Sequence, residues 1–264
     1  MKITETLNYL YGPVESWRMG TSLGVDPLSK NTKICNLDCI YCQLGRTQHL
    51  CNERKIYIKT ETILAEFDLL PPKLEVDYVT FSGRGEPTLA SNLGELIQGV
   101  RDKTTFETAV ITNSTLLHRA DVRADLSRAD LIIAKLDAVD ECSFIQIDKA
   151  MPGISFEQTL TGLKRLRDEY TGTLAVQLMF VEQNRKFAGE LAQLVREINA
   201  DEIQINTPLR PSSAAPLDQD GITEIKSHFK GLPAVSVYDR ERKESVPFSP
   251  AQTVKRHGNY IKIK

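Results

Sequence analysis

The sequence contains no long apolar run, and this absence excludes a membrane-spanning protein. None of its hydrophobic stretches approaches the roughly 18 residues that a transmembrane helix needs. The opening residues, MKITETLNYL, also lack the apolar core of a secretory signal peptide. We therefore expect a cytoplasmic protein that makes no contact with membranes.

An excess of charge of one sign is also missing. The 264 residues include 33 Lys and Arg against 35 Asp and Glu, which gives a formal net charge of −2. This balance provides no overall attraction to nucleic acid or to anionic lipid, although a local basic patch is compatible with it. No repeat of 20 to 50 residues and no low-complexity segment is present, which excludes solenoid and fibrous architectures.

Cysteine is scarce, and its distribution is uneven. Of the five cysteines, Cys35, Cys39 and Cys42 fall within eight positions. In a reducing compartment, such crowding indicates a metal site or catalysis rather than disulfide bonds. Thiolates are soft ligands that select zinc, copper(I) or iron–sulfur clusters.

The C-x3-C-x2-C spacing leaves the kind of metal centre open. A structural zinc site needs four ligands, and His49 and Cys51 are the nearest candidates for the fourth. A 4Fe–4S cubane held by three cysteines has one iron without a protein ligand, and that iron can chelate a small molecule. The spacing therefore fits either a zinc knuckle or a cluster with one open iron.

Short apolar runs alternate with amphipathic stretches along the chain, which predicts an α/β fold with parallel strands. We predict a partial (β/α)6-type barrel over residues 1–232, while an open doubly wound sheet and a complete barrel fit the same pattern. The predicted strands are residues 21–28, 76–83, 108–113, 130–137, 173–181 and 202–209. The predicted helices include residues 61–70 and 92–101, a stretch from Phe156 capped by Ser155 and Gln158, and a stretch from Phe187 to Ile198.

Chemically unusual residues follow each predicted strand, where ligands bind in parallel α/β folds. The cysteine loop, residues 29–46, follows the first strand, and GRGEP, residues 83–87, follows the second. The later strands are followed by TNS (112–114), by Lys135 and Asp137, by Asn184 and by TPLRP (207–211). We expect all six segments to meet at one rim of the sheet.

Residues 233–264 form a C-terminal extension of different composition. AVSVYDR within it suggests an edge strand, and TVKRHGNYIKIK near its end is basic. We expect a solvated tail here.

At the cysteine loop the chain resembles the radical S-adenosylmethionine (SAM) superfamily. The resemblance rests on the three cysteines, on Tyr41 directly before the last of them, and on GRGEP at the second strand. One branch, related to the tRNA-modifying wyosine-base synthases, is especially similar: its GPVPSRRLGRSLGVD and CVYCQLG compare with GPVESWRMGTSLGVD (12–26) and CIYCQLG (39–45) here. The resemblance covers roughly residues 10–212.

The resemblance implies ligands for both cofactors. Cys35, Cys39 and Cys42 would bind three irons of a 4Fe–4S cluster, and the fourth would take the amino and carboxylate groups of SAM. GRGEP (Gly83, Arg84, Gly85 and Glu86) resembles the superfamily's GGEP motif, whose backbone receives the methionine amino group, with Glu86 offering a carboxylate nearby. A plain strand-to-helix turn is the alternative interpretation, and Arg84 departs from the pattern.

Further SAM contacts are implied along the rim. Thr112 and Asn113 belong to a segment that resembles TNG, with Ser114 where glycine is usual. Lys135 and Asp137 stand where relatives contact the ribose or carboxylate of SAM, but they equally fit a rim ion pair. Gln177, a polar residue in an apolar strand, is expected to face the barrel interior, and Arg210 to meet a carboxylate or a substrate anion.

The implied activity is reductive cleavage of SAM to a 5′-deoxyadenosyl radical, which abstracts hydrogen from a substrate. An electron donor such as a flavodoxin or ferredoxin would reduce the cluster, and the substrate would be an RNA base or a peptide or protein side chain. Two alternatives remain open: a zinc-stabilised binding module without turnover, and a SAM-binding cluster scaffold without catalysis. Cys51 and Cys142 are expected to be free, and Cys142 to be buried and inert.

Overall fold

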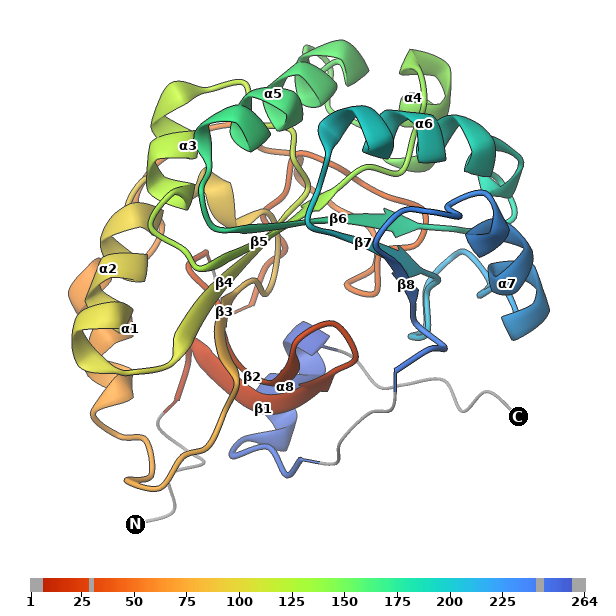
Figure 1. The fold of residues 1–264 in the computed structure, drawn as a ribbon. Coiled ribbons are helices and arrows are strands. Elements are labelled where there is room, and N and C mark those ends of the chain that lie inside the picture. The colour runs from red at the N-terminus through yellow and green to blue at the C-terminus, as the bar shows by residue number, and fades with distance from the viewer. Residues whose placement is uncertain (1–6, 29–30, 241–244, 258–264) are drawn as a thin grey trace.

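An eight-stranded sheet curls into an open barrel in the computed structural model of the protein (Figure 1). The structure describes residues 7–28, 31–240 and 245–257, so the first two residues of the predicted 29–46 loop and the end of the basic tail lie outside it. The strands lie side by side in chain order, with β1 antiparallel to β2 and every later pair parallel. They are β1 (Leu10–Ser16), β2 (Gly20–Val25), β3 (Tyr78–Phe81), β4 (Glu107–Thr112), β5 (Leu131–Lys135), β6 (Thr173–Met179), β7 (Glu202–Asn206) and β8 (Ala234–Ser236).

The six strands predicted from the sequence correspond to β2 through β7, and the predicted partial barrel is confirmed. The expected edge strand is β8, which pairs with β7. The sequence pattern missed β1, because its segment LYGPVES contains a glycine and a proline, which are tolerated at a sheet edge but hide the strand pattern.

Helices cover the outer face of the sheet (Figure 1). Ser155 caps α5 by accepting a hydrogen bond from the backbone of Gln158, as the sequence predicts. No helix among the described residues is long and apolar enough to cross a membrane. The helices are α1 (Thr60–Phe67), α2 (Leu93–Lys103), α3 (Ala120–Leu126), α4 (Glu141–Ile147), α5 (Phe156–Glu169), α6 (Ala188–Ile198), α7 (Gln219–Ser227) and α8 (Pro250–His257).

The two faces of the sheet have different side chains because successive residues of a strand point to opposite sides. The outward residues, such as Phe81, Ile132 and Val176, join the core beneath the helices. Inward residues near the carboxyl ends include Lys135 and Gln177, which line a cavity. The strand alternation thus separates an apolar outer core from a partly polar interior.

The gap between β1 and β8 is filled by side chains rather than by strand pairing. Trp17, in the turn between β1 and β2, packs with Leu209 and Val237 from the ends of the last strands. The guanidinium of Arg240 also donates a hydrogen bond to the carbonyl oxygen of Arg18, at 3.1 Å. The barrel is therefore open in its hydrogen bonding, although the β1–β2 turn contacts its far edge.

The C-terminal extension differs from the solvated tail that we expected. Residues 250–257 form α8, which packs against β1 beside the open side of the barrel (Figure 1). The side chain of Arg256 is fully buried and pairs with Asp26, which directly follows β2. The basic composition misled the prediction, because one of its charges has a buried counter-charge more than two hundred residues away.

Candidate active site

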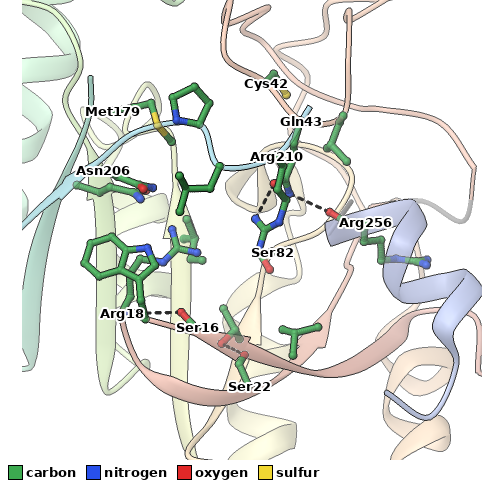
Figure 2. Close-up of a pocket in the computed structure, with 18 of the residues that line it drawn as sticks. Ser16, Arg18, Ser22, Cys42, Gln43, Ser82, Met179, Asn206, Arg210 and Arg256 are labelled. Atoms are coloured by element: carbon green, nitrogen blue, oxygen red, sulfur yellow. Dashed lines mark hydrogen bonds between the residues drawn. The ribbon is translucent and has the colours of Figure 1, made fainter. Parts of the chain in front are cut away.

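A cavity of about 240 Å³ runs inside the barrel from the carboxyl ends of the strands to the β1–β2 turn. Figure 2 shows Cys42 and Met179 at one end of it and Ser16, Arg18 and Ser22 at the other. Among the residues singled out from the sequence, those that line it are Tyr41, Cys42, Gly83, Gly85, Lys135, Gln177 and Arg210. Those that do not line it are Cys35, Cys39, Arg84, Glu86, Thr112, Asn113 and Asp137.

The cysteine loop is tied by its backbone to the GRGEP loop. Ile34 donates a hydrogen bond to the carbonyl of Arg84 and accepts one from the amide of Glu86, at 2.8 and 3.0 Å. Tight turns follow, in which Cys42 donates to the carbonyl of Cys39 and Gly45 to that of Cys42. The sequence thus places the three thiols on a loop whose start is fixed against the second rim segment.

The thiols are poorly hydrated and lie in a low-dielectric setting. Cys35 is buried, while Cys39 and Cys42 are half-buried. Burial raises the pKa of the Cys35 thiol to about 12 and the pKa of the Cys39 thiol well above its usual range. Thiolates at these positions would therefore require a cationic group beside them, and the irons of a cluster supply such charge.

The donor set fits a cluster better than a closed zinc site. Among the described residues, no three His, Cys, Asp or Glu side chains converge closely enough to hold a single metal ion. His49 is exposed, and the sulfur of Cys51 lies 3.3 Å from the Tyr57 hydroxyl. A cubane spreads its cysteine ligands over separate irons, so three thiols at different depths suit it.

Both glycines of GRGEP have a backbone conformation that other residues rarely adopt. Their φ angles are +129° for Gly83 and +153° for Gly85. A Cβ on Gly85 would overlap the carbonyl oxygen of Ile34, so glycine permits the close approach of the two loops. Arg84 points away from the cavity and donates to the carbonyl of Lys255 in α8, at 2.9 Å.

The carboxylate of Glu86 has protein donors on both oxygens. Oε1 accepts from the amide and hydroxyl of Thr88 and from the hydroxyl of Thr112, and Oε2 accepts from the amide of Asn113 at 2.7 Å. Burial raises the pKa of this carboxyl, while these bonds oppose the shift. Glu86 therefore joins the second and third rim segments, and the GRGEP backbone, rather than this carboxylate, faces the cavity.

Asn113 extends this connection to the cysteine loop. Its side-chain amide donates to Oδ1 of Asn36 at 2.8 Å and lies 3.8 Å from the sulfur of Cys35. The segment after β4 thus contacts the cysteine loop at its first cysteine, Cys35. The resemblance predicted a residue beside SAM at this position, and the structure places it beside an expected cluster ligand.

A buried polar network surrounds Tyr41, the aromatic residue before the third cysteine. Its hydroxyl contacts Asp137 and Asp148, and the ammonium of Lys135 donates to it at 2.9 Å. Lys135 also forms an ion pair with Asp137 at 3.2 Å and lies 4.0 Å from the centre of the Tyr41 ring. The rim ion pair that the sequence allowed is therefore present, with Lys135 facing the cavity and Asp137 beneath it.

The sequence analysis missed Asp148. Its carboxylate also lies 3.4 Å from the sulfur of Cys39. Burial, followed by the nearby Asp137 charge, raises the pKa of Asp148 to about 7. No sequence signal identifies this residue, because it comes from the end of α4 and reaches the cysteine loop only in the folded chain.

Gln177 and Arg210 complete the upper part of the cavity. Gln177 is 1% exposed and faces the interior, as predicted, and its Nε2 has no hydrogen-bond partner among the described residues. The guanidinium of Arg210 donates to the side chain of Gln43 at 2.6 Å (Figure 2). A buried amide donor without a protein partner is a favourable contact for a ligand atom.

Cys142 and Asn184 both lie outside the cavity lining. Cys142 is exposed rather than buried, because α4 packs through Ser143, Phe144 and Ile147 and turns Cys142 outward. Asn184 lies at the rim, as expected, but it is buried there and does not line the cavity. Its side-chain amide donates to the carbonyls of Asp137 and Met179, at the ends of β5 and β6.

The sequence profile of the radical SAM superfamily matches residues 31–195. A UPF0026 protein of Synechocystis is 44% identical over 229 residues, covering 86% of this chain and 84% of the relative. A UPF0026 protein of Methanocaldococcus jannaschii is 35% identical, covering 84% of this chain and 71% of that one.

Solved structures of low sequence identity share the fold. A structure of TYW1 with a lysine-pyruvate adduct bound has a TM-score of 0.60 at 20% identity and covers 81% of this chain and 76% of its own. A radical SAM methyltransferase from Sphaerobacter thermophilus has a TM-score of 0.62 at 15% identity, with 82% and 65% covered. Each similarity concerns the fold alone.

Proposed function

Because the chain belongs to the radical SAM superfamily, we propose that it is an enzyme that cleaves SAM reductively and abstracts hydrogen from a substrate. The observation that carries the proposal is that Cys42, Gly83, Gly85 and Lys135 come from three rim segments and line one cavity. One expected cluster ligand, Cys42, and the residues expected to bind SAM therefore line the same cavity.

Cys35, Cys39 and Cys42 would hold a 4Fe–4S cluster. When bound with SAM, such a cluster supplies the electron that breaks a C–S bond and yields a 5′-deoxyadenosyl radical. The protein's part is to fix the loop through the bonds of Ile34 and to bury Cys35 fully and the other two thiols in part. Because Cys42 lines the cavity, a cluster bound to it would lie next to the space where SAM would bind.

The residues around the cavity would bind and orient SAM. The GRGEP backbone would receive its amino group, because two glycines bring that backbone to the cavity wall. Lys135 would meet the ribose or carboxylate, since its ammonium is held in place by Tyr41 and Asp137. Gln177 would donate from its unpartnered amide, and Arg210 would face an anionic group.

The substrate is an RNA base or a peptide or protein side chain under this proposal, and an electron donor such as a flavodoxin or ferredoxin would reduce the cluster. Binding to bulk tRNA across a salt series separates the two substrate classes. An RNA substrate predicts affinity that falls steeply with salt, and a flat, weak response would favour the peptide class.

Metal analysis with spectroscopy tests the proposal against its two alternatives. Anaerobically prepared protein is expected to carry about four irons and four sulfides, and SAM should change the electron paramagnetic resonance spectrum of the reduced cluster. Stoichiometric zinc without iron or sulfide would instead support a zinc-stabilised binding module. If SAM changes the spectrum of the cluster but the protein never cleaves SAM, the result would support a SAM-binding cluster scaffold without catalysis.

A further inference from the structure

We propose that the C-terminal helix α8 completes the candidate active site, with Arg256 as a positioning residue for the cysteine and GRGEP loops. The inference rests on the proposed function and extends it to a segment outside the matched residues 31–195. Arg256 would make no contact with the reacting atoms. Its role would be to hold the two cofactor-binding loops in the geometry that SAM requires.

The buried guanidinium of Arg256 is fixed from several directions. Its Nε donates to Oδ2 of Asp26 at 2.9 Å, and its Nη1 donates to the side chain of Gln252 at 2.7 Å. A further bond reaches the carbonyl of Asn8, before β1. The side chains of Arg256 and Asp26 are both 0% exposed, so the pair is held in a defined geometry away from solvent.

Asp26 transmits this contact to the GRGEP loop. The oxygen that accepts from Arg256 also accepts from the backbone amide of Arg84, at 3.2 Å. Gly83 packs so closely on Asp26 that a Cβ would overlap its carboxyl group. The Arg84 side chain also donates a hydrogen bond to the carbonyl of Lys255 in α8. Helix and loop are thus joined by two separate connections.

A third connection reaches the cysteine loop. Gln43, the residue after Cys42, donates from its amide to the carbonyl of Arg256 at 3.3 Å and accepts from Arg210 (Figure 2). Arg256 also lines the cavity, where its guanidinium lies 5.6 Å from the Tyr11 ring centre. The end of α8 therefore contacts both cofactor loops and forms part of the wall between them.

A helix that served only as a cover would not need these contacts. An apolar helix face could protect β1 equally well, whereas a buried ion pair with one shared carboxylate fixes the orientation of the groups it joins. The shared oxygen of Asp26 means that a change at Arg256 alters the acceptor of the Arg84 amide directly. The predicted consequence is weaker SAM binding in the folded variant, in addition to the loss of stability that breaking a buried ion pair brings.

The test compares Arg256→Gln with Arg256→Lys, and uses Lys230→Gln as a matched loss of an exposed charge remote from the site. Arg256→Gln is expected to weaken SAM binding to the cluster-loaded protein at least tenfold, and Arg256→Lys to restore part of it. In cluster-free protein, alkylation of Cys42, followed by peptide mapping, should become several-fold faster in Arg256→Gln. Lys230→Gln should match the wild type in both measurements.

A second variant covers the case in which Arg256→Gln fails to fold. The double variant Asp26→Asn with Arg256→Gln replaces the buried charges by two amides of similar size, and the same losses are expected. Wild-type SAM affinity together with a wild-type Cys42 alkylation rate, in either folded variant, would overturn the inference. If wild-type protein binds SAM without cleaving it, the proposed function fails, while affinity and alkylation still decide the role of Arg256.

Discussion

Ser114 donates a hydrogen bond from its hydroxyl to the carbonyl oxygen of Lys135, at 2.8 Å, while its own backbone has a φ of +71°. This left-handed conformation costs residues other than glycine about 1 kcal/mol or more. Here the side-chain bond compensates for that cost. It also connects the segment after β4 to the strand that carries Lys135.

Removing the hydroxyl of Ser114 should destabilise the protein, whereas removing the whole side chain should not. Ser114→Ala retains the strained backbone and loses the bond, so we expect about 1 kcal/mol less free energy of unfolding. Ser114→Gly loses the same bond but relieves the strain, which should bring it within about 0.5 kcal/mol of the wild type. Denaturant unfolding measures both, and equal losses in the two variants would contradict this explanation.

Gly85 should tolerate no side chain. In Gly85→Ala the new methyl group would meet the backbone carbonyl of Ile34, so we expect a loss of more than about 2 kcal/mol in stability and no measurable SAM binding. Gly45→Ala is the control, since Gly45, on the cysteine loop, has a φ of +73° but no atom within 4 Å of the added group. Only the strain of about 1 kcal/mol should appear there. Thermal unfolding and SAM titration of both variants provide the comparison.

Glu86 should be needed as a carboxylate, because both of its side-chain oxygens accept hydrogen bonds and an amide could accept through only one of them. Glu86→Gln would place an amide donor against the hydroxyl or backbone donors of Thr88, Thr112 or Asn113. We expect a loss of about 1–3 kcal/mol in the free energy of unfolding. Glu61→Gln, on the exposed surface of α1, should change it by less than about 0.5 kcal/mol. Similar values for the two variants would show that the Glu86 contacts contribute nothing to stability.

Gln177 and Gln204 should respond in opposite ways to replacement by leucine. The Nε2 of Gln177 has no partner among the described residues, whereas Gln204 has an Oε1 without a described partner but an Nε2 that donates to Glu202 at 2.8 Å. Leucine at position 204 would therefore leave the Glu202 oxygen without this donor. Gln177→Leu should therefore keep or raise the melting temperature and weaken SAM binding about tenfold, or about 1.4 kcal/mol. Gln204→Leu should lower the melting temperature and leave SAM affinity unchanged. Unchanged affinity in Gln177→Leu would remove this residue from the SAM site.

The sequence was sufficient for much of the barrel because its central strands are buried on both faces. The apolar runs at β3 through β7 are visible without any tertiary information, and rim residues such as Lys135 follow from the ends of those runs. β1 was not predictable in this way, since an edge strand that contains Gly12 and Pro13 has no clear period.

The parts of the site that sequence reasoning missed are long-range contacts. Asp148 meets Cys39 across 109 positions, and Arg256 meets Asp26 across 230 positions. No local pattern encodes such pairs, because each charge is compatible with an exposed position until the fold buries its partner. Composition suggested a basic tail, whereas burial showed that Arg256 belongs to the wall of the cavity.

Product analysis of SAM cleavage tests the central claim most directly. Anaerobically reconstituted protein, supplied with dithionite and SAM, is predicted to release 5′-deoxyadenosine and methionine, while the Cys42→Ala variant releases neither. The claim would be contradicted by cluster-loaded protein that yields no 5′-deoxyadenosine. Full cleavage by Cys42→Ala would contradict it equally, since the chemistry would then not depend on the three-cysteine site.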